Sequence, residues 1–327
     1  MERMPIAAAL LTVASLDPLV ASTSRRWQRQ DGRVIEEIML HGMTLGRTFG
    51  TASGTTSDDQ VGFLLTLPGT RHQIEWFAES PGGFTDEQQA YLETIALMLV
   101  APLQVVVERS VTRNLLQAYL GRRSAEKVLS GTVRRGIGEV IEAVVWISDL
   151  RDFSLLSEAL PPDQVITALN DCCARLVGAI HPYGGEVLKF IGDGLLAIFP
   201  LAAGGENVAC EAAIAAVRAA RHGMAQLDSA RLGAGLPPLP FGIGLHLGAV
   251  VYGNIGAADR LDFTAIGSAV NVASRIEGLC RSLGCPVLIS NAVATRCTTS
   301  LTAVGLHALR GIAQPIELFT LPELIQP

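Results

Sequence analysis

The second half of the chain changes its hydrophobic period in a fixed order. A continuous apolar run, AVVWISDL at 143–150, is typical of a buried strand, and residues 161–180 then place apolar side chains at helical spacing. The stretch EVLKFIGDGLLAIF predicts two strands joined by a Gly-Asp-Gly turn. Further helical and strand-like segments follow in alternation, at 206–227, 241–256, 268–284 and 285–290. This order predicts an α+β fold with a palm-like, ferredoxin-like mixed sheet and helices packed on one face.

The first 107 residues have a different character. Short apolar segments alternate with glycine, proline and polar clusters, as in strands joined by turns. These segments lie at 34–40, 61–67 and 72–78. A capping-box pattern at Thr85 and Gln88 then starts a helical period. The opening stretch MERMPIAAALLTVASL favours a helix that begins a soluble domain over a signal peptide. We therefore predict a small α/β domain over residues 1–107.

Residues 108–140 are predicted to form a helical connector. Apolar side chains repeat at four-residue steps from Val107 to Tyr119, and Gly121 stops the helix. Two interpretations of this stripe stay open, packing within its own domain or a parallel dimer contact, although it is too short for a coiled coil. The arginine- and glycine-rich residues 121–139 predict a second short helix and a loop. The second domain then occupies residues 141–327.

Composition excludes several classes of function. A net charge of −6 without a basic patch argues against a nucleic-acid partner. The longest apolar run, Ile95 to Val107, is broken by Pro102 and Gln104 and is shorter than the roughly 20 residues that a bilayer requires, so we expect no membrane span. The six cysteines show neither paired metal-ligand spacing nor the density of a disulfide scaffold. They predict reduced thiols in a cytoplasmic protein.

Two aspartates end or interrupt the apolar strands. Asp149 follows the first strand, and Asp193 lies at the tip of the predicted hairpin. Carboxylates at neighbouring strand ends can hold divalent cations against substrate phosphates, although Asp-Gly is also a common hairpin turn. Lys189, four residues before Asp193, is one of only two lysines among 25 basic residues. This scarcity makes Lys189 a candidate functional residue.

The later helix carries a second polar set. Asn271 and Arg275 are four residues apart and therefore share one helix face. Such a pair suits recognition of a sugar and a phosphate, and it is also typical of a solvated polar stripe. The first turn of the helix predicted after Asp149 offers free backbone N–H groups to phosphates.

The glycines at 242, 244 and 248 do not predict a dinucleotide-binding loop. A proline-rich loop precedes them and a strand-like segment follows, whereas that loop requires a strand before and a helix after. His246, within the same segment, is more typical of a packed strand residue than of a ligand.

Together, the segments AVVWISDLRDFS, LKFIGDGLLAIF and RLDFTAIGSAVNVASRIE resemble the catalytic domain of class III nucleotidyl cyclases, which form cyclic AMP or cyclic GMP. The resemblance covers about residues 141–320. It implies an adenylate cyclase that converts ATP to 3′,5′-cyclic AMP and pyrophosphate by attack of the ribose 3′-hydroxyl on the α-phosphate. The N-terminal domain resembles GAF-like sensory domains loosely, which implies an unknown regulatory ligand or partner.

The resemblance also implies the metal site and the assembly. In this family the counterparts of Asp149 and Asp193 hold two divalent ions, Mg²⁺ or Mn²⁺, with help from the backbone carbonyl of Leu150. The active site lies between two catalytic domains, one providing the aspartates and the other the nucleotide-binding side chains. Because this chain contains both sets, the resemblance implies a homodimer with two equivalent sites.

The nucleotide-binding residues follow from the same resemblance. The counterparts of Lys189 and Thr264 contact the adenine base, and this pair favours ATP over GTP. The counterpart of Asn271 orients the ribose, and that of Arg275 stabilises the pentavalent phosphorus. The remaining predicted substrate-binding residues are Phe153, Ser154, Arg260 and Arg310.

Three residues depart from the family pattern. Asp152 stands where glycine is usual, Ser154 replaces a threonine, and Ser268 replaces a common aspartate. Asp152 adds a negative charge near the predicted phosphate-binding turn. Two alternatives to an adenylate cyclase are a guanylate cyclase and a catalytically silent nucleotide-binding regulatory protein. Silent relatives normally lose a metal-binding aspartate or the arginine, and this chain retains all of them, which favours the enzyme.

Overall fold

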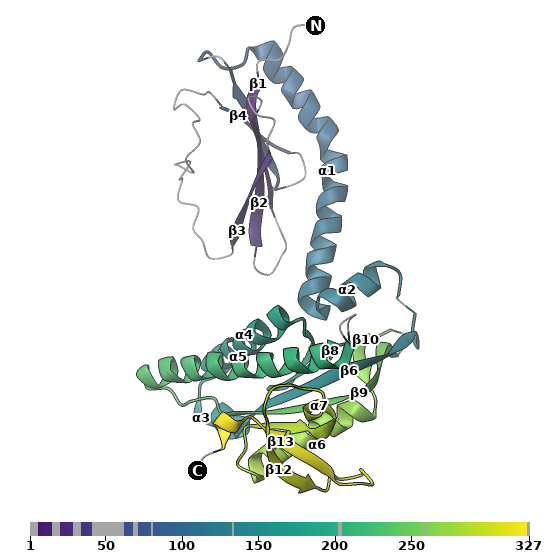
Figure 1. The fold of residues 1–327 in the computed structure, drawn as a ribbon. Coiled ribbons are helices and arrows are strands. Elements are labelled where there is room, and N and C mark those ends of the chain that lie inside the picture. The colour runs from purple at the N-terminus through teal and green to yellow at the C-terminus, as the bar shows by residue number, and fades with distance from the viewer. Residues whose placement is uncertain are drawn as a thin grey trace. The chain divides into compact units, whose positions relative to one another are not determined.

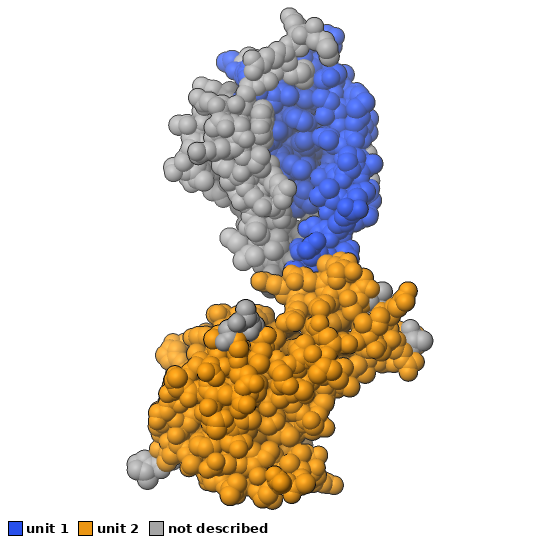
Figure 2. Space-filling view, turned by 45° about the vertical axis from the view of Figure 1, so that its right-hand side comes forward, with its two compact units in different colours: residues 1–119 blue, residues 120–327 orange. Residues whose placement is uncertain are grey.

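The structure is a computed structural model of the 327-residue chain. It describes residues 6–14, 20–28, 34–40, 62–67, 71–79, 81–132, 134–201, 205–257 and 259–325. The chain divides into two compact units, residues 1–119 and residues 120–327, which Figure 2 shows in blue and orange. The division falls within the predicted connector at 108–140.

Unit 1 contains a five-stranded sheet and a long helix (Figure 1). The strand order is β3-β2-β1-β5-β4, and every neighbouring pair is antiparallel. The elements are β1 (Ile6–Ala14), β2 (Val20–Gln28), β3 (Val34–Leu40), β4 (Gly62–Thr66), β5 (Gln73–Ala78) and α1 (Asp86–Leu120). The predicted capping box is confirmed, because the Thr85 N–H donates to Gln88 Oε1 at 3.0 Å and the Gln88 N–H donates to Thr85 Oγ1 at 3.3 Å.

The N-terminal segment forms β1, and the predicted opening helix is therefore wrong. β1 pairs with β2 along one edge and with β5 along the other, so it is the central strand of the sheet. Ala8 and Leu10 are buried, with less buried residues on either side of each. Backbone pairing along both edges overrides the helix propensity of this alanine-rich stretch.

The two helices predicted on either side of residue 107 form one continuous helix. α1 runs for 35 residues with Pro102 inside it. By length and composition α1 could cross a membrane, because one 18-residue window reaches a mean hydropathy of 1.8. The expectation of no membrane span considered a shorter apolar run; α1 meets the criteria of length and composition alone, which core helices also meet, so that expectation stays a prediction. Leu92 and Ala96 of α1 pack in small apolar clusters with residues of the sheet, Ala78 and Ile74 among them.

Unit 2 is an eight-stranded mixed sheet with helices, which confirms the predicted fold class. The strand order is β12-β13-β11-β9-β6-β8-β7, and β10 pairs with β9 outside this path. Only the β11–β9 pairing is parallel among the described strands. The strands are β6 (Gly138–Leu150), β7 (Glu186–Ile191), β8 (Gly194–Pro200), β9 (Phe241–Gly256), β10 (Leu261–Ile266), β11 (Val287–Ser290), β12 (Thr302–His307) and β13 (Ile316–Thr320). The helices are α2 (Arg122–Leu129), α3 (Phe153–Ala159), α4 (Pro162–Ile180), α5 (Gly205–Gly233), α6 (Ser268–Ser282) and α7 (Asn291–Ala294), with 3₁₀ turns at His181–Tyr183 and Pro322–Leu324.

Helices cover both faces of this sheet, which corrects the expectation of one covered face. Val144 and Trp146 of β6 belong to the apolar cluster that α4 and α5 share. The alternate residues Val145 and Ala143 belong to a second cluster, which contains Ala273 of α6. Because successive side chains of a strand point to opposite faces, α4 and α5 lie on one side of the sheet and α6 on the other (Figure 1).

α6 packs closely on β9 because β9 carries glycines at the crossing point. A Cβ atom at Gly244 would lie 2.5 Å from both the carbonyl oxygen of Ala273 and the backbone nitrogen of Glu277. One at Gly242 would meet the Glu277 carboxylate. These glycines therefore allow close helix-to-strand packing and do not form a phosphate-binding loop, as predicted.

α2 is attached to the sheet through a buried carboxylate. Glu186 of β7 accepts hydrogen bonds from the Ser124 N–H at 3.1 Å and from the Tyr252 hydroxyl at 3.3 Å. Burial raises the pKa of Glu186, although these hydrogen bonds partly oppose the shift. The guanidinium of Arg123 lies over the Tyr252 ring, 5.5 Å from its centre. The second helix of the predicted connector is therefore fixed to β7 and β9.

Gly244→Ala should destabilise unit 2. The added methyl group meets backbone atoms of α6, which cannot rotate away, so we expect a loss of about 1–3 kcal/mol of unfolding free energy. In a thermal unfolding experiment this corresponds to a lower melting temperature by roughly 2–10 °C.

Gly178→Ala is the matched control, because Gly178 lies on the exposed side of α4 and an added Cβ there has no neighbour within 4 Å. Alanine is the better helix former, so this variant should gain up to about 1 kcal/mol. Equal melting temperatures for the two variants would contradict the proposed crossing contact.

Candidate active site

Asp149 and Asp193 meet at one end of the unit 2 sheet. Asp149 lies near the end of β6, opposite Gly242 of β9. Asp193 lies in the turn between β7 and β8, and the two side chains are close enough to share a hydrogen bond. A Cβ atom at Gly194, the first residue of β8, would lie 2.9 Å from Asp149 Oδ1. The tight turn therefore places the Asp193 side chain beside that of Asp149.

A third carboxylate, Glu277 of α6, belongs to the same group. Burial, then the charge and hydrogen bond of Asp193, raise the pKa of Asp149 to about 6. Burial, followed by the Asp149 charge, raises the pKa of Glu277 to about 7, although Arg151 opposes this shift. Asp149 and Asp193 are therefore in contact, and Glu277 interacts electrostatically with both of them and with Arg151.

These carboxylates fit a divalent cation. The crowding raises the pKa of Asp149, and a bound cation would relieve the repulsion between carboxylates. Oxygen donors suit Mg²⁺, which usually keeps several waters and binds through one or two carboxylates together with substrate phosphates. No group of three or more histidine, cysteine or acidic side chains in the described part of the chain forms a complete cage for a metal. The site therefore fits a cation that is shared with a phosphorylated ligand.

Lys189 and Thr264 lie on neighbouring elements away from this group. Lys189 Nζ is 2.5 Å from Oδ2 of Asp262, which stands two residues before Thr264 on β10. Alternate residues of a strand share a face, so Asp262 and Thr264 point the same way. Thr264 Oγ1 is buried and has no hydrogen-bond partner among the described residues. An unsatisfied buried hydroxyl is costly unless a ligand completes it.

Asn271 and Arg275 follow on α6, as predicted. Asn271 is exposed and Arg275 is partly buried, while the buried residues of α6 face the sheet. A Cβ atom at Gly311 would lie 3.8 Å from Arg275 Nη2, so this guanidinium is near the loop that carries the exposed Arg310. No ion pair in the described part of the chain joins Arg275 to Asp149 or Asp193.

Asp152, the departure from the family pattern, adopts a left-handed conformation at the start of α3. Its φ is 57° and its ψ is 28°, and it is the one non-glycine residue with positive φ among those described. Its Oδ1 is 2.7 Å from Arg281 Nη2 of α6. The negative charge that Asp152 adds is therefore partnered by a residue that the sequence alone did not indicate.

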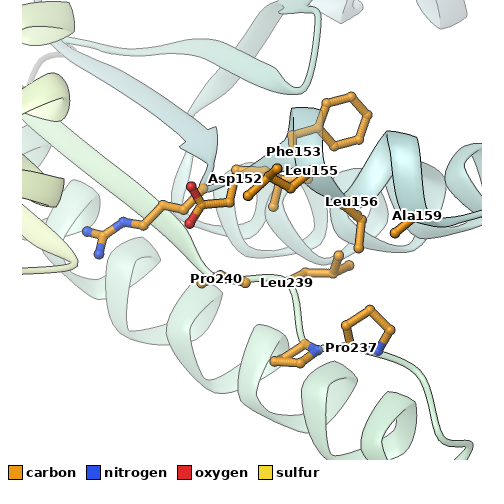
Figure 3. A pocket seen from close by; sticks show the side chains of 11 residues that line it. Asp152, Phe153, Leu155, Leu156, Ala159, Pro237, Leu239 and Pro240 are labelled. Atoms are coloured by element: carbon orange, nitrogen blue, oxygen red, sulfur yellow. The ribbon is translucent and has the colours of Figure 1, made fainter.

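A cavity of about 320 Å³ lies beside α3. Leu156 and Ala159 face Leu239 and Pro237 across it (Figure 3). The lining is mostly apolar, which does not suit a triphosphate. Phosphate contacts are therefore expected outside this cavity.

The other predicted residues lie at the end of β6, at the start of α3 and just before β10. Leu150 is buried at the end of β6, Phe153 is partly buried at the start of α3, and Ser154 is exposed there. Arg260 is exposed just before β10. His246 has a hydrogen-bonding distance of 3.0 Å to Ser290 Oγ, and burial lowers its pKa to about 4, which agrees with a packed strand residue. All six cysteines are free thiols.

Sequence reasoning missed Glu277, Asp262 and Arg281. Glu277 and Arg281 lie on the helix predicted at 268–284. Their interactions, of Glu277 with Asp149 and of Arg281 with Asp152, arise only from the tertiary fold. Asp262 offered a weak signal, because it alternates with Thr264 along a strand.

Comparisons with known proteins find adenylate cyclases among the relatives of this chain. The chain is 38% identical over 158 residues to an adenylate cyclase of Anabaena cylindrica, an alignment that spans 48% of this chain and 31% of that protein. The alignments with the first curated relatives span 27–31% of the length of those relatives.

Two solved structures are similar. One is an adenylyl cyclase from P. aeruginosa, with a TM-score of 0.52, 28% identity, and coverage of 58% of this chain and 97% of that one. The other is a bacterial light-regulated adenylyl cyclase, with a TM-score of 0.58, 26% identity, and coverage of 82% and 87%.

The sequence profile of the adenylate and guanylate cyclase catalytic domain matches residues 139–321. This range is more than half of the chain and contains the carboxylate pair, Lys189, Thr264, Asn271 and Arg275. The protein therefore belongs to the class III adenylate and guanylate cyclase catalytic domain family.

Proposed function

We propose that this protein is an adenylate cyclase that converts ATP to 3′,5′-cyclic AMP and pyrophosphate. The observation that carries the proposal is the carboxylate pair of Asp149 and Asp193 in the same unit as a lysine and a threonine on adjoining strands. The family match and the adenylate cyclases among the relatives support it.

Asp149 and Asp193 would hold two divalent ions, Mg²⁺ or Mn²⁺, together with the backbone carbonyl of Leu150. Such ions supply Lewis acidity, which lowers the pKa of the ribose 3′-hydroxyl and neutralises phosphate charge. The contribution of the chain is to hold both carboxylates side by side at the end of the sheet, oriented toward the phosphates.

The α6 residues act on the ribose and the reacting phosphate. Asn271 orients the ribose so that its 3′-hydroxyl is in line with the α-phosphate. Arg275 donates hydrogen bonds to the oxygens on which charge develops during the attack. Further substrate contacts are assigned to Phe153, Ser154, Arg260 and Arg310.

Lys189 and Thr264 select the base. A lysine is a compact single-point donor that suits a ring nitrogen, whereas the wide fork of arginine does not. Asp262, 2.5 Å from Lys189 Nζ, holds the ammonium beside Thr264. The unpartnered Thr264 hydroxyl supports a role in contacting the base.

The active sites form between two copies of the chain. Successive residues of an α-helix are turned by about 100°, so Glu277 lies roughly 200° around α6 from Arg275. Glu277 is on the side that meets Asp149, and Arg275 therefore points away from the carboxylates of its own chain. A homodimer in which each copy provides one set of residues brings the two sets together at two equivalent sites.

The N-terminal unit regulates this activity from within a cytoplasmic protein. A light-regulated adenylyl cyclase with similar structure covers 82% of the chain, which is more than unit 2 alone. The Ser124 N–H of α2 donates to Glu186 of β7, and Glu186 stands three residues before Lys189 on the same strand. A change transmitted to α2 would therefore reach the base-binding strands. A GAF-like identity for unit 1, and a ligand or partner that it senses, belong to this proposal.

A guanylate cyclase is the second candidate, because the family includes both enzymes and the Thr264 hydroxyl can either donate or accept a hydrogen bond. A silent nucleotide-binding protein is a third candidate. It would bind nucleotide but form no cyclic product.

The first test is activity and its dependence on both residue sets. Purified protein with ATP and Mg²⁺ or Mn²⁺ should form cyclic AMP. Asp193→Asn and Arg275→Ala should each lower the rate by at least about 100-fold, because one removes a metal ligand and the other a transition-state contact. A 1:1 mixture of the two inactive variants should recover about a quarter of the wild-type rate, since half of the dimers then contain one intact site.

Asp171→Asn, an exposed change on α4, is the matched control and should retain full activity. Nucleotide binding without cyclic product under all of these conditions would overturn the proposal in favour of the silent protein. If the mixture recovers almost no activity although the subunits are shown to exchange, the sites are not shared between two chains. That result would leave the adenylate cyclase activity itself unaffected.

Lys189→Met should mainly damage substrate choice. Loss of the donor to adenine is expected to lower kcat/KM for ATP by roughly 100-fold while GTP turnover changes little. The other lysine of the chain, Lys127, pairs with Glu139 on the surface, and Lys127→Met should leave both values nearly unchanged. Equal losses for ATP and GTP in Lys189→Met would count against base recognition.

Asp149→Asn should stabilise the metal-free protein while abolishing activity. The pKa of Asp149 in the folded state is about 6 against an ordinary 3.8, so its stabilising protonated form is fully present below pH 3.8 and is lost as the pH rises through 6. At pH 7.5 the variant should gain about 1–2 kcal/mol, an amount discounted from the full shift because solvent screens this partly exposed group.

Melting temperatures of both proteins should converge near pH 4. Added Mg²⁺ or Mn²⁺ should stabilise the wild type at pH 7.5 and have little effect on Asp149→Asn. A variant that is less stable than the wild type at pH 7.5 without metal would contradict the crowding of carboxylates.

A further inference from the structure

A second cavity, of about 200 Å³, lies next to the carboxylate group and has no part in the proposed reaction. One wall is the face of α5 that carries Arg221, Ala225 and Asp228, and the opposite wall is formed by Arg151, just beyond β6, and Phe241, at the start of β9. The spacing of four and then three residues places the α5 side chains on one face of the helix.

Two guanidinium groups share this cavity, and neither forms an ion pair within the described part of the chain. Arg221 makes no ion pair within the described part of the chain, and its recorded contact is with the ring of Phe241, 5.7 Å from its centre. Arg151 donates from Nη2 to the carbonyl oxygen of Cys285 at 3.2 Å. The Nε atoms of both arginines are buried without a hydrogen-bond partner. Burial, and then the charge of Arg151, lower the pKa of Arg221, although the charge of Asp228 opposes this shift.

The acidic groups around the cavity do not balance this charge. Asp228 lines the same cavity, but its Oδ1 accepts a hydrogen bond from the Leu239 N–H at 2.7 Å and lies in no ion pair with either arginine. Glu277 does not line this cavity, and no ion pair in the described part of the chain joins it to Arg151. Two positive charges therefore face one carboxylate across a small space, an arrangement that is unfavourable without an anion.

We propose that this cavity binds a small oxyanion, such as sulfate, phosphate or a carboxylate, between the guanidinium groups of Arg151 and Arg221. Planar guanidinium groups bind oxyanions through paired charge-assisted hydrogen bonds, and the cavity is smaller than the pockets that hold a nucleotide. This site is independent of cyclase activity. Since Arg151 follows Asp149 by two residues, an anion bound to Arg151 would also restrain the end of β6, next to the proposed metal site.

The test uses thermal unfolding of the full chain without divalent metal or nucleotide, with sulfate replacing chloride at constant ionic strength. Wild type should show a saturable rise in melting temperature of roughly 3–6 °C at about ten times the Kd, above the small linear rise that sulfate gives any protein. Arg221→Met should lose the saturable rise, and Arg221→Lys, which keeps the charge without the fork, should retain part of it. In chloride, Arg221→Met should be as stable as the wild type or more stable, because it removes an unpaired charge.

Two arginines serve as matched controls. Arg218 lies one turn earlier on α5, is exposed and pairs with Glu323, and Arg218→Met should keep the saturable rise. Arg275→Met should also keep it, which separates this cavity from the proposed nucleotide site. Equilibrium dialysis with labelled inorganic phosphate should find one site per chain that weakens at least about tenfold in Arg221→Met.

Three results would overturn the proposal. They are a purely linear sulfate effect in the wild type, a saturable effect that survives Arg221→Met, and a saturable effect that is lost in Arg275→Met but not in Arg221→Met. A lower melting temperature of Arg221→Met in chloride, with an unchanged sulfate response, would show that Arg221 only packs on Phe241.

Discussion

The close packing of α6 on β9 is the constraint on which the rest of unit 2 depends. Gly244 lets the backbone of α6 lie against the strand, with no space for even one methyl group between them. At this depth Glu277 is close enough for the charge of Asp149 to raise its pKa, while Asn271 is exposed and Arg275 is partly buried. A helix held farther from the sheet by a side chain at Gly244 would lose this contact. The glycines thus decide which residues of α6 face inward.

The carboxylate group that results is unfavourable in the metal-free protein. Burial and the neighbouring Asp193 carboxylate raise the pKa of Asp149, and burial and the Asp149 charge raise the pKa of Glu277. The fold tolerates the repulsion because β6 pairs with β9 along thirteen residues, from Gly138 to Leu150, and so fixes Asp149 in place. Perturbed carboxylates at the end of a rigid sheet are typical of sites that gain stability from a ligand, and this is why the pair supports a functional interpretation more strongly than either aspartate alone.

The order of elements in unit 2 could be predicted because buried strands and amphipathic helices leave different periods in a sequence. The Gly-Asp-Gly turn likewise placed Asp193 at a hairpin tip. Contacts between distant segments leave no such period, so Glu277 and Asp262 gained their significance only from the packing of α6 on β9 and of β10 beside β7. In unit 1, local composition was misleading. An alanine-rich stretch became the central strand β1, because strand pairing along both edges outweighs weak local preferences, and α1 continues through Pro102.

Asp152 shows how a departure from a family pattern is accommodated. A left-handed conformation costs a non-glycine residue about 1–2 kcal/mol, although aspartate tolerates it better than most. Its ion pair with Arg281 is exposed on both sides, and such pairs contribute about 0–1 kcal/mol, so the pair does not offset the backbone cost. The contribution of Arg281 is therefore electrostatic, since it neutralises a carboxylate beside the turn where nucleotide phosphates are proposed to bind. Salt screens an exposed pair but leaves the backbone conformation unchanged. The charge and the shape of this turn thus depend on different interactions, and only the charge responds to ionic strength.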